Sequence, residues 1–419
     1  MRSSLDQGDK ISSAPAAAPD ALDELLRFGA LMLRAGNTAL RTRERMEVMA
    51  RRMGFDAVTV VLTLDSVTAS VRRAGEWTTA VREIGPPGIN AWRISELDRL
   101  AASVEARLAP RELAASLGKI EFAPHLYSDA LLAAAIGVAS GAFAFLNGGA
   151  MPEMIAAAIG GGIGQGSRAR LSRRQLNQYG VAAVCALVAS GSYVVAAALA
   201  GLIGFGFAHH PAGFISSVLF LVPGFPLVAA LFDLMQHQTV VAVTRFAYGV
   251  MILLVVAFGL SIVVALAGVD LSRPPPPELA YPLRLILRGV ASFLAGCAFA
   301  MLFNNPARTV IAAGLLALAA NELRLALHDS GMMLAPATFF GALAIGLLAT
   351  LVDRRFDIPR IATTVPPIII MVPGLYAFEM IVLLQRGEML NALQASASCG
   401  FVIGALAMGL AAARLISRR

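Results

Sequence analysis

The sequence predicts a mainly α-helical polytopic membrane protein, with ten transmembrane helices as two inverted five-helix repeats and a small N-terminal α+β cytoplasmic domain. Three observations predict this fold. Of 419 residues, 57% are hydrophobic and 15% charged, and the mean hydropathy is +0.71, a balance that water cannot solvate. Apolar stretches recur from Tyr127 to the C-terminus. Short motifs in the first half of that region recur in the second.

The first part of the chain is expected to lie outside the membrane. Residues 1–19 are rich in Ser, Ala, Pro and Asp and have no apolar core like that of a secretory signal, so they are expected to be a disordered leader. Residues 20–122 are expected to form the cytoplasmic domain. Its first helix spans residues 20–53, with Asp20 as the cap, Gly36-Asn37 as a point of division and Gly54 as the end.

Three Val- and Thr-rich segments follow and are predicted to be strands: VTVVLTL, VTASVRRA and WTTAVREI. Asp65-Ser66 and Gly75-Glu76 are expected to form the hairpin turns, and Pro86-Pro87-Gly88 ends the strand run. Ser95 followed by Asp98 resembles a capping box and predicts a helix that starts there.

Ten apolar stretches follow, and several approach the roughly 20 residues needed to cross a bilayer. The second and seventh are short. They cover residues 127–147, 151–166, 179–207, 213–234, 240–268, 283–303, 307–322, 333–351, 362–385 and 391–413. Residues 123–270 are expected to hold the first repeat and residues 271–419 the second, with five spans each.

The arginines predict that both termini are cytoplasmic, in the inner membrane of a bacterium. With the N-terminal domain inside, eleven arginines fall in inside loops: Arg168, Arg170, Arg173, Arg174, Arg308, Arg354, Arg355, Arg360, Arg414, Arg418 and Arg419. Five fall in outside loops: Arg273, Arg284, Arg288, Arg324 and Arg386. An even number of spans agrees with this orientation.

The charge distribution argues against a nucleic-acid partner. Residues 1–126 hold 17 Lys and Arg against 16 Asp and Glu, so the excess behind the net charge of +7 lies in the membrane region, where arginines set topology. Cys185, Cys297 and Cys399 lie in apolar segments and are expected to be small buried hydrophobes. No cofactor or metal site is predicted. The expected partners are a small-molecule substrate and the lipid bilayer, and a homo-oligomer stays open.

The two halves of the membrane region share motifs. Val222-Pro223-Gly224 in the fourth span matches Val372-Pro373-Gly374 in the ninth, at an offset of 150 residues. Ala142-Phe143-Ala144 matches Ala298-Phe299-Ala300 at an offset of 156. Five spans per repeat is an odd number, so the second repeat would be inverted, an arrangement that transporters use for alternating access. Chance matching in apolar sequence is the alternative.

Pro223-Gly224-Phe225-Pro226 interrupts the fourth span, and Pro366-Pro367 with Pro373-Gly374 interrupts the ninth. Proline and glycine break the backbone hydrogen-bond ladder, which lipid tolerates only where protein or a water-filled cavity satisfies the freed groups. The half-helix after each break would aim its amides at that cavity, which suits an α-carboxylate. A plain packing kink is the alternative.

Asp233 and Glu379 follow the two breaks, and an intramembrane charge is costly enough to suggest function. Either carboxylate could hold the substrate ammonium or a coupling proton, and an ordinary charge at a helix end is the alternative. Asp233 aligns with Leu383, not with Glu379. His237 follows Asp233 by four residues, so the two could share a helix face and pass a proton, although a loop histidine is the simpler interpretation. Glu153, Arg245 and Glu322 lie near predicted span ends and rank lower.

An enzyme is not indicated. No nucleophile stands with a base, and the run GGGIGQG lacks the lysine of a phosphate loop. Gly137/Gly141 and Gly160/Gly164 are better explained as close helix contacts.

Several of these segments together resemble the threonine/serine exporter family. The similarity covers residues 22–414: FGALMLRAGNTALRTRERMEVMARRMGFD, three strands, Gly88-Ile89-Asn90, Asn147-Gly148-Gly149 and LFLVPGFPL. The resemblance implies a cytoplasmic domain before about ten spans and efflux of threonine or serine driven by the proton motive force, an antiport. Related members move dipeptides or dicarboxylates.

The sequence therefore predicts a secondary-active exporter of small amino acids, not an enzyme. A membrane-anchored hydrolase and an exporter of dicarboxylates or dipeptides are the alternatives. The expected substrate-binding residues are Pro223, Gly224, Phe225, Pro226, Asp233, Pro373, Gly374, Glu379, Asn147, Asn304 and Asn305, with Asp233, His237 and Glu379 as proton-coupling candidates.

Overall fold

The computed structural model describes residues 18–85, 88–102, 108–174, 176–202, 211–268, 279–356, 358 and 360–417. The chain divides into two compact units. The N-terminal unit holds Met1–Pro87 and Glu96–Ala123, and the helical unit holds Gly88–Ser95 and Pro124–Arg419. The predicted leader lies outside the described residues up to position 17.

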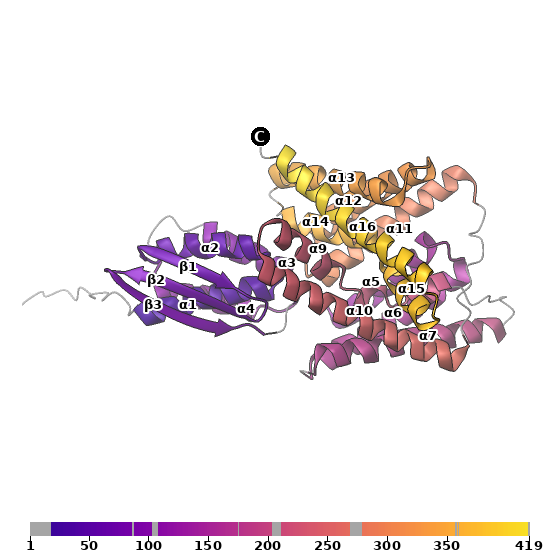
Figure 1. Ribbon diagram of the computed structural model, residues 1–419, viewed down its shortest axis with the longest axis horizontal. Coiled ribbons are helices and arrows are strands. Elements are labelled where there is room, and N and C mark those ends of the chain that lie inside the picture. Colours follow the sequence, from indigo (N-terminus) through magenta and orange to yellow (C-terminus); the bar gives the residue numbers. More distant parts are fainter. Residues whose placement is uncertain are drawn as a thin grey trace, which may run out of the picture. The chain divides into compact units, whose positions relative to one another are not determined.

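The N-terminal unit is a three-stranded antiparallel sheet packed against helices (Figure 1). Its elements are α1 (Ala18–Arg34), α2 (Ala39–Arg52), β1 (Ala57–Leu62), β2 (Ser66–Arg73), β3 (Glu76–Glu83) and α4 (Pro110–Glu121). The helix α3 (Ala91–Ala102) belongs to the helical unit up to Ser95 and to the N-terminal unit from Glu96. The strand order β1-β2-β3 confirms the three predicted strands. The predicted division of the first helix is also confirmed, because Gly36 has a φ of +97° and Thr38 caps α2.

The predicted start of the next helix is wrong. The helix α3 begins at Ala91, and Asn90 caps it by accepting a hydrogen bond from the Arg93 amide at 3.0 Å. Ser95 donates to the carbonyl of Ala91 within the helix, and Asp98 pairs with arginines of α2. The sequence Ser95-x-x-Asp98 resembles a cap, but an asparagine five residues earlier performs that role.

The helical unit is built from long helices and two bent pairs. Its elements are α5 (Asp129–Leu146), α6 (Met151–Ser172), α7 (Gln178–Leu202), α8 (Pro211–Ser216), the 3₁₀ turn η1 (Leu219–Leu221), α9 (Gly224–Met235), α10 (Thr239–Ala267), α11 (Tyr281–Leu302), α12 (Ala307–Asp329), α13 (Leu334–Phe356), α14 (Arg360–Met371), α15 (Gly374–Gln385) and α16 (Met389–Ile416).

Seven helices among the described residues are long and apolar enough to cross a membrane, or up to nine spans if each bent pair crosses once. The helix α6 has 22 residues but is too rich in Gly and polar residues to meet the same criterion. Gly141 of α5 and Gly160 of α6 bring neighbouring helices close together, as predicted. A Cβ on Gly141 would lie 2.9 Å from the Met154 carbonyl oxygen, and one on Gly160 would lie 2.6 Å from that of Ala189.

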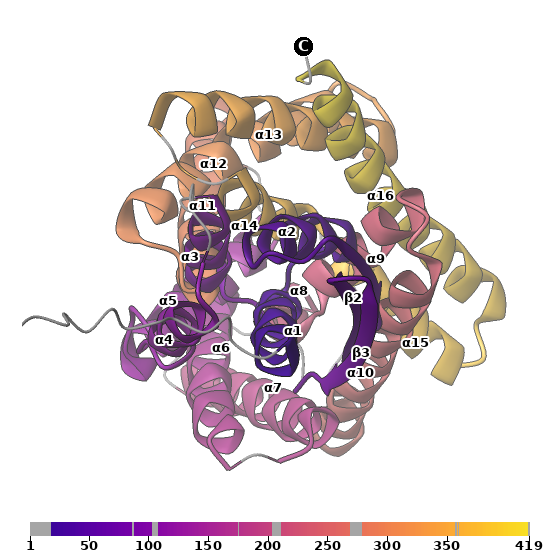
Figure 2. The same ribbon diagram turned by 90° about the vertical axis from the view of Figure 1, so that its left-hand side faces the viewer.

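The two halves of the helical unit have matching contact patterns. In the first half α5 packs on α6, α6 on α7, α7 on α10, and α10 on α9. In the second half α11 packs on α12, α12 on α13, α13 on α16, and α16 on α15. Contacts α5–α11, α10–α15 and α9–α16 join the halves. Figure 2 shows the first half in magenta to salmon and the second in orange to yellow.

Several arginines that the sequence placed in loops lie within helices instead, among them Arg168 and Arg324. Arg168 is four residues before the end of α6, and Arg324 is five residues before the end of α12. The helices continue past the apolar stretches that were used to predict their ends, because buried helix faces do not need apolar residues on every side. Both arginines therefore have to be considered as intramembrane charges.

Candidate functional site

Both predicted breaks are present and have the same backbone geometry. Pro223 precedes α9 with φ −79° and ψ 53°, and Pro373 precedes α15 with φ −80° and ψ 54°. The amides of Gly224 and Gly374 each donate to the valine carbonyl two residues earlier at 2.8 Å. These are inverse γ-turns, in which a proline is well accommodated because its φ is fixed near this value. They bend the two helix pairs by 60° and 41°.

The two breaks pack against each other. A Cβ on Gly224 would lie 3.0 Å from Cγ2 of Val372, in the other break. A Cβ on Gly374 would lie 2.7 Å from Cδ2 of Leu219 and 3.5 Å from Cγ2 of Val222. Each glycine thus accommodates apolar side chains that come from the opposite half of the unit, and the two interrupted helices meet at one point.

A cavity of about 260 Å³ lies where they meet. Its wall takes four residues from each half: Phe143, Leu219, Val222 and Gly224 with Phe299, Ile369, Val372 and Gly374. Each residue of the first set has its counterpart in the second at an offset of 156 or 150. The two phenylalanine rings meet edge to face, with centroids 5.8 Å apart.

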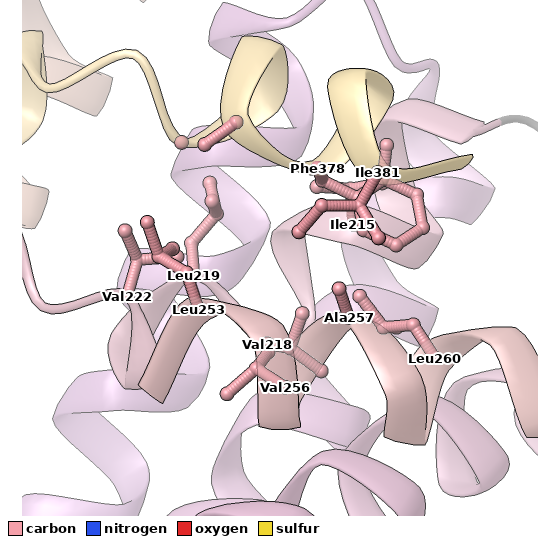
Figure 3. A pocket seen from close by; sticks show the side chains of 12 residues that line it. Ile215, Val218, Leu219, Val222, Leu253, Val256, Ala257, Leu260, Phe378 and Ile381 are labelled. Carbon is pink, nitrogen blue, oxygen red and sulfur yellow. The ribbon is translucent and has the colours of Figure 1, made fainter. Parts of the chain in front are cut away.

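A second cavity of about 280 Å³ adjoins the first and is lined by apolar side chains (Figure 3). It shares Leu219, Val222 and Gly374 with the first cavity. Its other walls are α8, α10 and α15, and Figure 3 shows Phe378 and Ile381 of α15 near Ile215 of α8. A lining of this kind offers no hydrogen bond to a polar solute, so polar contacts in this region have to come from backbone at the breaks.

The first turns of α9 and α15 supply backbone donors. No acceptor among the described residues takes the amides of Phe225 in α9, or of Leu375 and Tyr376 in α15. Pro226 has no N–H, so α9 offers fewer donors than α15. First-turn amides carry the positive end of the helix dipole and favour an anion.

Asp233 does not stand alone, because Arg245 of α10 lies within ion-pair distance. Nη1 of Arg245 is 3.0 Å from Oδ2 of Asp233, and the two residues are 5% and 0% exposed. The sequence ranked Arg245 low for its position near a span end, although an arginine in the second turn of a strongly apolar helix is a usable signal. Leu383 and Ala395 occupy the matching positions of the second half, so the pair belongs to the first half alone.

His237 lies in the loop after α9, as the simpler interpretation of the sequence has it, and does not share a helix face with Asp233. The helix α9 ends at Met235, and His237 follows it in the left-handed conformation with φ 59°. The amides of His237 and Gln238 donate to the carbonyls of Leu234 and Asp233, which makes a Schellman motif. Gly387, with φ 77°, ends α15 in the same way. His237 therefore takes a position that glycine usually fills.

Glu379 lies in α15, six residues after Pro373, and is partly buried. It is three residues after Tyr376, so both side chains project from one face of the helix.

The three candidate asparagines lie at the ends of α5 and α11 and hold the chain there. The Asn147 amide donates to the Phe143 carbonyl at 2.9 Å. Asn304 accepts from the Leu126 amide at 2.8 Å and donates to the side chain of Asn90 at 3.2 Å. Asn305 donates to the carbonyl of Ala300 at 2.9 Å. They are thus engaged with the backbone at the helix ends and with the Gly88-Ile89-Asn90 segment, and none of them lines either cavity.

Comparison with known families supports an exporter. A family model described as "Putative threonine/serine exporter" matches residues 23–267, and a second, described as "Threonine/Serine exporter, ThrE", matches residues 288–416. The families concern transporters and not enzymes, which removes the hydrolase alternative.

Curated relatives agree with the family models. The chain is 24% identical over 386 residues to a "Probable threonine/serine exporter" of Mycobacterium tuberculosis, covering 86% of this chain and 69% of the relative. It is 26% identical over 369 residues to a "Threonine/serine exporter" of Corynebacterium glutamicum, covering 84% and 73%. A "Probable succinate transporter subunit YjjP" of Klebsiella aerogenes is 22% identical over 242 residues, covering 57% and 90%. No solved structure matches the chain.

Proposed function

The chain belongs to the threonine/serine exporter family, and from this premise we propose that it exports threonine or serine by secondary-active transport driven by the proton motive force. The observation that carries the proposal is the meeting of two identically broken helices at one small cavity. A broken helix is stable within a membrane only where its freed backbone groups find hydrogen-bond partners. A bound substrate can be such a partner.

The substrate site lies between the two breaks. The first turns of α9 and α15, which begin at Pro223-Gly224-Phe225-Pro226 and Pro373-Gly374, receive the carboxylate through their free amides. Glu379 holds the ammonium group or the coupling proton. Asp233 takes part through its ion pair with Arg245, and protonation of Asp233 would release that pair.

The helical unit crosses the bacterial inner membrane ten times as two inverted repeats, with both termini in the cytoplasm. The matching contact patterns of the halves and the paired walls of the cavity support this arrangement. With α6 as a buried crossing, the seven long helices and two bent pairs become ten spans. Rocking of one half against the other would open the cavity to each side in turn.

A small dicarboxylate is the second candidate substrate, since one relative is named a succinate transporter subunit. Two half-helix termini facing one cavity could each receive a carboxylate. The Pro226 position weakens one of the two termini and favours a substrate with a single carboxylate.

Vesicles containing the purified protein test the proposal. They are loaded with radiolabelled threonine, serine or succinate, and efflux is followed with and without an imposed proton gradient. We expect threonine and serine to leave faster than from empty vesicles, and the gradient to accelerate their efflux. Efflux of succinate alone would assign the dicarboxylate function instead. Efflux of all three at the rate of protein-free vesicles would contradict the proposal.

A further inference from the structure

Arg324 is a partly buried cation that has no part in the proposed mechanism so far. It lies near the C-terminal end of α12, and its side chain reaches the end of α14, in keeping with the tilt of Cα–Cβ bonds toward a helix N-terminus. It is 156 residues after Arg168 of α6, the offset that also relates Phe143 to Phe299. Both halves of the unit therefore carry an arginine at the same helical position.

The guanidinium of Arg324 reaches the second break. Its Nη1 donates to the carbonyl of Met371, the last residue of α14, at 3.3 Å. The next residue, Val372, lines the central cavity. The phenol of Tyr376, in the first turn of α15, is close enough to interact electrostatically with the guanidinium. Arg324 thus connects the end of one half-helix with the start of the other.

This guanidinium has unused donors. Its Nε is buried and, within the described part of the chain, has no hydrogen-bond partner. None of the carboxylates described forms an ion pair with it, in contrast to Arg245 with Asp233 and Arg288 with Asp329. A guanidinium with a buried Nε and one carbonyl for a partner is poorly compensated, and a planar fork of five donors is suited to a carboxylate.

We propose that Arg324 binds the carboxylate of the exported substrate at the second break, together with the free amides of Leu375 and Tyr376. This inference rests on the proposed function and specifies its substrate contact. Glu379 projects from the face of α15 that carries Tyr376, one turn further on, so a cation and an anion flank one site. That order of charges matches the carboxylate and ammonium groups of an α-amino acid.

A structural role is the competing explanation, in which Arg324 only satisfies the C-terminal carbonyls of α14. The two explanations differ in what they predict about the ligand. A capping arginine stabilises the protein whether or not a carboxylate is present. A carboxylate-binding arginine makes the protein discriminate between a carboxylate and its neutral amide.

The experiment measures ligand-induced thermal stabilisation of the purified full-length protein by L-threonine, L-serine, succinate and L-threoninamide. In the wild type we expect L-threonine or L-serine to stabilise at concentrations at least tenfold below those that L-threoninamide needs. In Arg324→Gln we expect the apparent affinity for the carboxylates to fall by about 10- to 100-fold, the loss expected for charge-assisted hydrogen bonds. Arg324→Lys keeps the charge but lacks the planar fork of donors, so its apparent affinity for the carboxylates should lie between those of the wild type and Arg324→Gln. Arg386→Gln, an exposed arginine at the end of the same bent helix pair, is the matched control and should bind as the wild type does.

Equal stabilisation of the wild type by L-threonine and L-threoninamide would overturn the inference without any variant. Wild-type affinity and discrimination in Arg324→Gln would also overturn it, and the vesicle assay would then still uphold the exporter function. A wild type that responds to succinate alone would refute threonine and serine as substrates, and loss of that response in Arg324→Gln would still support the inference. A wild type that responds to none of the carboxylates would overturn both proposals.

Discussion

At the residue scale, the charges of the helical unit are compensated in different ways. Asp233 and Arg245 neutralise each other, whereas Arg324 has a carbonyl and a phenol as its neighbours. A buried ion pair loses most of its benefit to desolvation, so its presence is a weak argument for stability. The pair agrees with the proposed step in which protonation of Asp233 opens it.

The Asp233–Arg245 pair gives a first prediction, in which stability and transport respond differently to substitution. Asp233→Asn should destabilise the protein by about 3–5 kcal/mol, because it leaves Arg245 buried without its carboxylate. Asp233→Leu with Arg245→Ala, the residues of the second half, should recover most of that loss. Thermal unfolding in detergent measures the stability and vesicle efflux measures the transport. We expect the double variant to fold and to transport poorly, and normal efflux would assign the pair a structural role.

Glu379 gives a second prediction. Glu379→Gln keeps the size and removes the charge, so stability should change by less than about 1 kcal/mol while efflux falls at least tenfold. Glu388→Gln, an exposed residue before α16, is the control and should leave efflux unchanged. Unchanged efflux in Glu379→Gln would remove this residue from the mechanism.

Sequence patterns identified the intramembrane carboxylates but not their surroundings. Asp233 and Glu379 are conspicuous because charges are rare in apolar stretches. Arg245 and Arg324 were placed near predicted span ends, where arginines usually set the orientation of a membrane protein. Whether such a side chain points into the protein or toward water depends on how its helix packs, which composition does not reveal.

At the element scale, the breaks were the best-predicted feature, because proline and glycine act on the backbone locally. Helix starts and ends were less predictable. The cap of α3 is Asn90 and not Ser95, since several polar residues compete for such a position. His237 took a left-handed conformation that its identity does not indicate.

The reciprocal packing of the breaks predicts how their glycines respond to substitution. Gly224→Val should destabilise by about 1–3 kcal/mol and reduce efflux, because the new side chain would overlap Val372. Gly224→Ala combined with Val372→Ala should be tolerated better than Gly224→Ala alone. Gly191→Ala in α7, where nothing lies within 4 Å, is the control and should be neutral or slightly stabilising. Equal effects at Gly224 and Gly191 would show that the breaks are not closely packed.

At the scale of the whole molecule, hydropathy and the spacing of apolar residues predicted a mainly helical fold with a small sheet. They did not determine how many helices cross the membrane. The helix α6 is long enough to cross but is rich in glycine, and its packing against α5 and α7 would permit the proposed crossing without an apolar composition. Hydropathy alone cannot distinguish such a helix from a partial span.

The inverted arrangement makes a prediction that labelling can check. Arg174 and Ser330 lie in the equivalent loops after α6 and α12, so inverted repeats place them on opposite sides of the membrane. In a background with Cys185, Cys297 and Cys399 replaced by serine, a membrane-impermeant maleimide should label Ser330→Cys in intact cells and Arg174→Cys only after permeabilisation. Labelling of both in intact cells would mean that the repeats run parallel.

The ion pair that exists in one half alone has a further consequence for the cycle as a whole. Two identical halves would give end states of equal energy, and the idle carrier would face each compartment half of the time. A contact worth only about 1.4 kcal/mol to one end state sets a tenfold bias in occupancy. If the proposed cycle breaks the Asp233–Arg245 pair in one of the two end states, the idle carrier rests mostly in the other, and substrate or proton has to offset that preference.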